Sequence, residues 1–135
     1  MKKKVVPILY LILSAATVIL NALPTAVKLQ FASGPDQYYY EYFSGFDIVP
    51  LGYAVWGPLL GGVVAIVLVV HSICLLIKPN AVLKKWMLGL TAFSWIMFIS
   101  PSFTGMVSLV GCIASTLMSV QLLMLTFDKD NIIQK

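Results

Sequence analysis

Residues 86–127, WMLGLTAFSWIMFISPSFTGMVSLVGCIASTLMSVQLLMLTF, contain no charged side chain. As one helix, these 42 residues would extend about 63 Å at 1.5 Å per residue, roughly twice the thickness of a bilayer's hydrocarbon core. Residues 100–105, SPSFTG, form a cluster of turn-forming residues inside the stretch. We therefore predict two membrane-spanning helices here, at residues 82–100 and 104–127.

Two more uncharged stretches lie nearer the N-terminus. Residues 5–27 carry no charged side chain, and neither do residues 48–77 unless His71 is protonated. Because about 20 predominantly apolar residues are enough to cross a bilayer, we predict two further spans at residues 5–23 and 56–77. The chain is therefore expected to have four membrane-spanning helices.

The composition agrees with a membrane fold. Of the 135 residues, 60% are hydrophobic and 10% are charged, whereas a soluble domain usually carries about 25% charged residues. Much of the surface is therefore expected to face the lipid bilayer. The predicted fold class is all-α membrane: a bundle of four transmembrane helices in one domain, residues 1–135, with a loop at residues 24–55.

The distribution of lysines predicts the orientation of the chain. All nine basic residues are lysines, and only Lys28 falls in the loop between the first two spans. Short loops rich in lysine stay in the cytoplasm. We therefore expect a multi-pass protein of the plasma (cytoplasmic) membrane with both termini in the cytoplasm and the loop outside. The cytoplasmic lysines would be Lys2, Lys3, Lys4, Lys78, Lys84, Lys85, Lys129 and Lys135.

The first span has a second interpretation. Three lysines at residues 2–4 followed by an apolar run also describe a secretory signal peptide. Against this, the run is long, and Asn21 and Pro24 accompany its end in place of a site of small residues. Cleavage would leave three helices with the N-terminus outside, and both interpretations stay open.

The extracytoplasmic loop has the pattern of a β-hairpin. Residues 25–32 alternate between apolar and polar side chains, and residues 37–43 are rich in aromatic ones. Between them, residues 33–36, SGPD, are a turn signal. Because an isolated hairpin is marginally stable in water, we expect it to lie on the outer ends of the helices, with a short third strand near residues 46–49.

Three tyrosines of this loop, Tyr38, Tyr40 and Tyr42, are candidate recognition residues. Tyrosine is favoured at recognition surfaces because it gives a large contact area at low entropy cost. A structural interpretation is also open, because tyrosine suits strands and the headgroup zone of a membrane.

His71 is the only clearly ionisable side chain that lies well inside a predicted span. At 100° per residue it shares a helix face with Gly57 and Gly61, and small residues of this kind let helices approach closely. An ionisable group in a membrane is a functional candidate. A neutral histidine bonded to a serine or a backbone carbonyl near the cytoplasmic end of the helix is the other interpretation.

The remaining polar residues of the spans favour helix packing. Asn21 extends a polar stripe on the first span, and Gln121 lies in the inner third of the fourth. Both are candidates for a polar path, but no Asp, Glu or Lys occurs at mid-membrane. Hydrogen bonds between membrane helices contribute about 0.6 kcal/mol each on average. The fourth span also carries a stripe of small residues: Gly111, Ser115 and Ser119.

Several classes of function are not expected. Cys74 and Cys112 lie at different depths of their spans and cannot pair directly. No cluster of nucleophile, base or metal ligands is recognisable, so we expect no enzyme, metal or cofactor site. Arginine is absent, and most lysines flank apolar segments, which fits poorly with a nucleic-acid-binding face.

Residues 42–53, YFSGFDIVPLGY, precede an apolar helix. This stretch resembles small uncharacterised four-helix membrane proteins of Firmicutes-type bacteria, a family with no assigned activity to carry over. The layout is also similar to the claudin plan of four helices with strands in the first outer loop. The tryptophans and cysteines of the claudin loop motif are missing, and architecture alone does not transfer function.

The leading expectation is therefore a non-enzymatic envelope interaction or accessory protein, acting through its extracytoplasmic aromatic loop or its helix faces. Its partners would be the bilayer and a membrane or envelope protein, or further copies of the chain. The alternative is a small transporter or channel subunit with a polar path near His71.

Overall fold

The computed structural model describes residues 2–48, 56–104 and 108–128, with the side chains of residues 2–4 and 104 excepted. Four of its helices are long and apolar enough to cross a membrane, and two strands form one antiparallel hairpin. The predicted mainly helical fold with a small hairpin is thereby confirmed. The elements are α1 (Lys2–Ala22), β1 (Val27–Gly34), β2 (Gln37–Phe43), α2 (Trp56–Ile77), α3 (Ala81–Ile99), the 3₁₀-helix η1 (Ser100–Thr104) and α4 (Leu109–Asp128).

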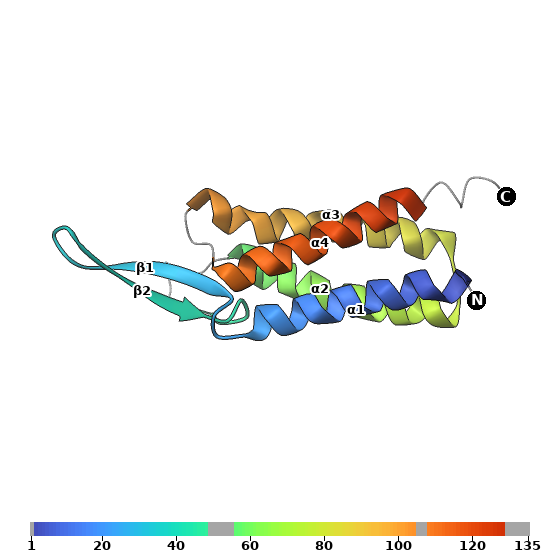
Figure 1. Cartoon of the computed structure of the whole chain (residues 1–135), viewed down its shortest axis with the longest axis horizontal. Helices are drawn as coiled ribbons and strands as arrows, with labels where there is room; N and C mark the ends of the chain where they lie inside the picture. The colour runs from blue at the N-terminus through green and yellow to red at the C-terminus, as the bar shows by residue number, and fades with distance from the viewer. Residues whose placement is uncertain (1, 49–55, 105–107, 129–135) are drawn as a thin grey trace.

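The four long helices lie side by side and run alternately up and down (Figure 1). Contacts join α1 to α2, α2 to α3, α3 to α4 and α4 back to α1. The hairpin projects from one end of this bundle, whereas α1 begins and α4 ends at the other end. The short α2–α3 connection is typical of antiparallel neighbours in a helical bundle.

Local sequence explains where α3 and α4 begin. Asn80 is the N-cap of α3 and accepts a hydrogen bond from the Val82 backbone N–H at 2.9 Å. The turn cluster that divides the long apolar stretch forms η1. The fourth helix begins at Leu109, later than the predicted residue 104, and Ser108 Oγ accepts the Gly111 N–H at 2.9 Å.

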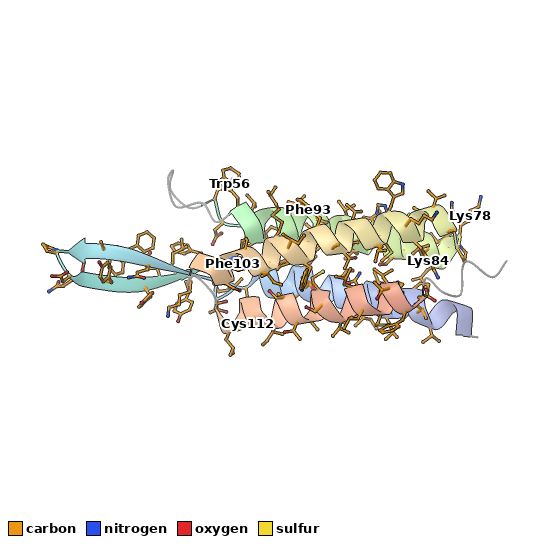
Figure 2. All side chains as sticks on the ribbon, turned by 90° about the horizontal axis from the view of Figure 1, so that it is seen from above. Trp56, Lys78, Lys84, Phe93, Phe103 and Cys112 are labelled. Carbon is orange, nitrogen blue, oxygen red and sulfur yellow. The ribbon has the colours of Figure 1, made fainter. Side chains whose placement is uncertain are left out.

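Apolar side chains occupy both the interior and the outside of the bundle. Fully buried Tyr10, Leu68, Met87 and Met118 are central to the core. Large apolar side chains also cover the outward faces of the helices (Figure 2). A soluble monomer rarely exposes apolar patches of this extent, so the outer surface of the bundle suits lipid.

The hairpin has the predicted turn. Gly34 pairs with Gln37, and Pro35 and Asp36 form the two-residue connection. Proline suits the first turn position because its φ is preset. Asp36 has φ 63°, a left-handed conformation that aspartate tolerates better than most residues.

The position of the hairpin differs from the prediction. It stands out from the bundle along the helix direction (Figure 1), where a hairpin lying across the helix ends was expected. Only its base is buried: Ala26, Val27 and Leu29 form a cluster with Phe31, Phe43 and Val110. Because apolar partners are available only at the base, the distal part of the hairpin extends away from the bundle.

The expected third strand is also absent from the described part of its range. Residues 46–48 have no strand conformation, and Val49 lies outside the described residues. The chain turns instead: Asp47 Oδ2 accepts the Ser44 N–H at 2.8 Å, and the Asp47 N–H bonds to Ser44 O at 3.1 Å. A turn closed by its own side chain satisfies backbone groups that a third strand would have paired.

Candidate functional site

Three tyrosines occupy one face of the hairpin. Antiparallel pairing places Tyr42 opposite Lys28 and Tyr40 opposite Gln30, so these residues share a face with Tyr38. The relative exposures of Tyr38, Tyr40 and Tyr42 are 61%, 52% and 53%. We call these three residues the tyrosine face.

Lys28 is held against the tyrosine face. Its Nζ lies 3.9 Å from the centroid of the Tyr40 ring, a cation–π contact worth about 0.5–1 kcal/mol at an exposed site. On the opposite face of the hairpin, Phe31 and Tyr39 stack with centroids 5.5 Å apart. Tyr39 therefore helps to hold the hairpin together, whereas the rings of the tyrosine face are more than half exposed.

The chemistry of the tyrosine face suits binding. Alternate strand residues repeat at about 6.8 Å, so the three rings form a ladder along β2. Tyrosine offers large contact area and a polar hydroxyl at low conformational cost. Among the described residues, no three His, Cys, Asp or Glu side chains are grouped to hold a metal ion.

Asn21, predicted as a polar candidate, joins α1 to two other segments. Its Nδ2 donates to Pro58 O at 3.1 Å, and its backbone oxygen accepts the Gly45 N–H at 2.8 Å and Ser44 Oγ at 3.2 Å. A Cβ added to Gly45 or Gly62 would overlap the Asn21 side chain. Asn21 therefore fixes the segment that follows the hairpin onto α1 and α2.

Gln121 and His71 have separate environments. Gln121 is fully buried and exchanges hydrogen bonds with Ser14 of α1 at 3.0 and 3.1 Å. His71 is partly exposed, and its Nδ1 lies 3.0 Å from Val67 O in its own helix. Asn21, His71 and Gln121 thus have different partners, and the hydrogen bonds of the described residues do not join them into one site.

Gly57 and Gly61 lie where α2 approaches α3. A Cβ on Gly57 would be 2.5 Å from Met97 O, and one on Gly61 would be 3.1 Å from the Phe98 ring. His71 was predicted on the same face, but its hydrogen-bond partner, Val67 O, lies within α2. A side chain at Gly57 would meet rigid backbone, and a side chain at Gly61 would meet the Phe98 ring.

The small residues of α4 lie against α3 and the hairpin base. Ser115 Oγ donates to Phe98 O at 3.1 Å, and Ser119 Oγ accepts from Trp95 Nε1 at 2.7 Å. A Cβ added to Gly111 would lie 3.0 Å from a carbonyl oxygen of the hairpin base. These residues therefore make interhelical hydrogen bonds and close approaches.

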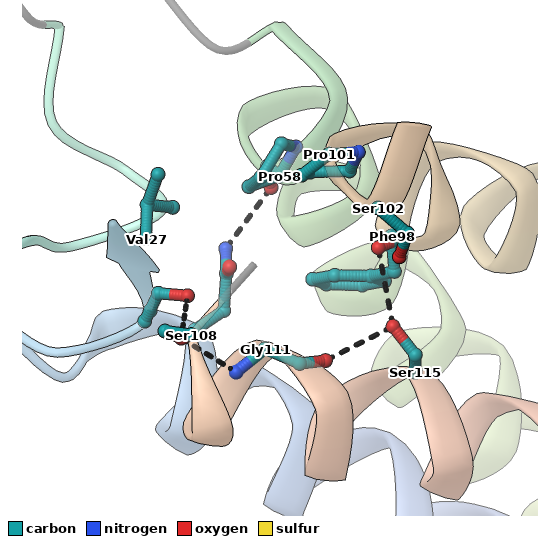
Figure 3. Close-up of a pocket in the computed structure, with 10 residues that line it drawn as sticks. Val27, Pro58, Phe98, Pro101, Ser102, Ser108, Gly111 and Ser115 are labelled. Carbon is teal, nitrogen blue, oxygen red and sulfur yellow. Dashed lines mark hydrogen bonds between the residues drawn. The ribbon is translucent and has the colours of Figure 1, made fainter. Parts of the chain in front are cut away.

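A small cavity lies under the hairpin base, where the helices meet (Figure 3). Asn21, Pro58, Phe98, Ser108 and Ser115 are among its lining residues. Its volume is about 20 Å³, enough for roughly one water molecule. A cavity of this size does not accommodate a metabolite.

A larger groove, which the sequence did not predict, lies beside the hairpin base. Its volume is about 510 Å³, and it opens between the start of the hairpin and the start of α4. We call it the hairpin-base groove. The only sequence signal for it was the isolated Lys28. Its lining residues are Thr25, Lys28, Tyr42, Ser108, Leu109 and Val110.

A second unpredicted feature lies at the opposite end of the bundle. Lys84 of α3 forms an ion pair with Asp128 of α4, and these side chains are only 24% and 17% exposed. The Tyr10 hydroxyl also donates to Asp128 Oδ2 at 3.5 Å. This cluster joins three helices at that end.

Comparisons with protein-family models, with curated proteins and with solved structures found no match to the chain. The functional interpretation therefore rests on the fold and the sites described above.

Proposed function

We propose that this chain is a non-enzymatic multi-pass membrane protein that binds a protein partner through its tyrosine face. The supporting observation is the position of Tyr38, Tyr40 and Tyr42, which are each more than half exposed on a hairpin that projects from the bundle. The partner surface would offer apolar groups to the rings and hydrogen-bond acceptors to the hydroxyls.

The stability of the hairpin supports this proposal. Two isolated strands are marginal in water, and here only the base packs against α4. Five of the seven residues of β2 are aromatic, yet β2 is exposed along most of its length. Contact with a partner would cover the rings and stabilise the distal strands.

The proposed orientation places the hairpin outside the cytoplasmic membrane and both termini in the cytoplasm. Lys78 and Lys84 lie at the end opposite the hairpin, whereas Trp56 lies near the hairpin (Figure 2). Trp56 and Trp86 are both exposed and suit the two interfaces of a bilayer.

Single-cysteine labelling tests this orientation. In a Cys74→Ser/Cys112→Ser background, an impermeant maleimide should label Ser33→Cys in intact cells. Pro79→Cys, in the α2–α3 connection, should be labelled only after the cells are permeabilised. The reverse pattern would contradict the proposed orientation.

A transporter or channel with a path near His71 receives less support. The buried Gln121 is bonded to Ser14, Asn21 is bonded to Pro58, and the cavity between the helices holds about one water. Polar groups that bond to each other are typical of helix packing. A pH-dependent flux in liposomes that His71→Ala changes would favour transport.

Site-specific photo-crosslinking tests the proposed binding function. A photoreactive residue at position 40 should give a discrete crosslinked band in cells, and one at position 41, on the opposite face, should not. Adding Tyr38→Ser and Tyr42→Ser should remove the band, whereas Gln37→Ala, also on the opposite face, should keep it.

The outcome also identifies the partner class. A band at twice the mass of the chain would show that the tyrosine face joins two copies. Crosslinking of equal strength from positions 40 and 41, or none from position 40, would overturn the proposal.

A further inference from the structure

The hairpin-base groove combines two kinds of wall. Thr25, Lys28 and Tyr42 line it on the hairpin side, where Lys28 Nζ lies over the ring of Tyr40, and Leu109 and Val110 line it on the α4 side. A volume of about 510 Å³ is within the ordinary range for a small-ligand site, which is roughly 300–1,000 Å³. The groove therefore fits an amphiphile with a polar head and an apolar tail.

The charge of the groove is positive. Among the described residues, Lys84 and Asp128 form an ion pair at the far end of the bundle. No described carboxylate forms an ion pair with Lys28. Glu41 lies on the opposite face of the hairpin by strand alternation. Asp47 is bonded to the backbone of Ser44. An anionic head is thus favoured over a neutral or cationic one.

The groove lies at the level where lipid heads would be. It adjoins the first residue of α4, one of the four helices apolar enough to span a membrane. Leu109, on its apolar wall, is 81% exposed, and an acyl chain would cover it. Lysine and tyrosine side chains commonly occupy this interfacial level, where their stems meet lipid and their polar tips meet headgroups.

We propose that the hairpin-base groove binds the phosphate head of an anionic phospholipid in the outer leaflet. Lys28 and the hydroxyls of Thr25 and Tyr42 contact the phosphate, and the acyl chain lies along Leu109 and Val110. This binding anchors the base of the hairpin at the membrane surface. It rests on the proposed membrane orientation. Tyr42 belongs to both the groove and the tyrosine face, whereas Thr25, Lys28 and Leu109 belong to the groove alone.

Native mass spectrometry of the purified full chain in a mild detergent tests this proposal. The probes are phosphatidylglycerol and phosphatidylcholine with identical acyl chains, added at increasing concentrations. We expect preferential binding of phosphatidylglycerol, reduced about tenfold by Lys28→Gln, since a charge-assisted hydrogen bond is lost. Lys85→Gln, which changes an exposed lysine at the other end of the bundle, should leave the preference unchanged.

Two further arms separate the lipid from a soluble phosphate. Leu109→Ser should weaken phosphatidylglycerol binding, and glycerol 1-phosphate at the same concentration should not compete. Competition by glycerol 1-phosphate with no effect of Leu109→Ser would overturn the lipid assignment. Equal binding of the two lipids, or equal effects of Lys28→Gln and Lys85→Gln, would overturn the site itself. Thermal unfolding of each variant verifies that it is folded, and no partner protein enters the assay.

Discussion

Polar side chains are buried inside the helix bundle, whereas the tyrosines of the hairpin are exposed. In the bundle, Ser14, Asn21 and Gln121 are buried and hydrogen-bonded, and among the described side chains only Thr91 Oγ1 is buried without a partner. In the hairpin, tyrosine rings remain exposed. Lipid offers no hydrogen bonds, so polar groups in a bilayer must be satisfied internally, whereas water tolerates exposed hydroxyls.

This difference indicates where each region can act. The bundle uses its polar groups to hold helices together and has few left to meet a ligand. The hairpin uses Phe31, Tyr39 and the buried base for its own stability and leaves Tyr38, Tyr40 and Tyr42 outward. Predicted changes in the two regions should therefore differ in size and in kind.

The largest contrast is expected between glycines of the two regions. In Gly62→Ala, the added methyl group would overlap the Asn21 side chain and lie 2.7 Å from the Phe46 ring. We expect the free energy of unfolding to fall by about 2 kcal/mol, a typical cost of overpacking. Titration with a denaturing detergent measures this change.

Two controls accompany this substitution. A Cβ at Gly89 in α3 or at Gly34 in β1 would have no neighbour within 4 Å. Gly89→Ala should be neutral or slightly stabilising because alanine favours helix, and Gly34→Ala should leave the bundle unchanged. Equal losses at Gly62 and Gly89 would contradict the tight junction at Asn21.

The next contrast concerns lysines. Lys84→Met leaves the carboxylate of Asp128 without its ion pair in a mostly buried position, and we expect a loss of about 1–2 kcal/mol. Lys28→Met removes a cation–π contact at a partly exposed site and should cost about 0.5 kcal/mol. Thermal unfolding in detergent compares the two.

Lys85 provides a control for the same experiment because it is an exposed neighbour of Lys84. Lys85→Met should leave the melting temperature almost unchanged. A larger loss from Lys28→Met than from Lys84→Met would mean that the hairpin, and not the ion pair, limits the stability of the fold.

A smaller effect is expected from the buried pair of Ser14 and Gln121. A double-mutant cycle with Ser14→Ala and Gln121→Leu should give a coupling free energy of about 0.6 kcal/mol, the average for hydrogen bonds between membrane helices. Unfolding measurements on the four proteins give this value. A coupling near zero would mean that the two side chains do not stabilise the α1–α4 contact.

The smallest effect is expected at the hairpin turn. Asp36 has φ 63°, a conformation that glycine adopts without steric cost. Asp36→Gly should stabilise the hairpin by a few tenths of a kcal/mol at most, because glycine also adds freedom to the unfolded chain. Hydrogen exchange of the Gly34 and Gln37 amides measures the local change, and the helix amides should stay unaffected.

The two regions also differed in how far the sequence predicted them. Local patterns located the four apolar helices and the turn at Pro35 and Asp36. The projection of the hairpin was not predicted, because it depends on packing at Ala26, Val27 and Val110. The start of α4 at Leu109 was predicted too early, although Ser108, which accepts the Gly111 N–H, is a local signal for it. The candidate tyrosines were identifiable from the aromatic stretch at residues 37–43, whereas the groove beside Lys28 was not predicted.

Sequence alone determined the number of apolar helices, the hairpin and the aromatic strand that carries Tyr38, Tyr40 and Tyr42. Hydropathy, alternation and turn preference act over a few residues, so they are visible without a fold. Only the tertiary structure decided that Asn21 fixes the segment after the hairpin, that Lys84 pairs with Asp128 and that Lys28 faces Leu109 across a groove. Each of these contacts joins residues far apart in the chain, and their meeting depends on how the helices and the hairpin pack.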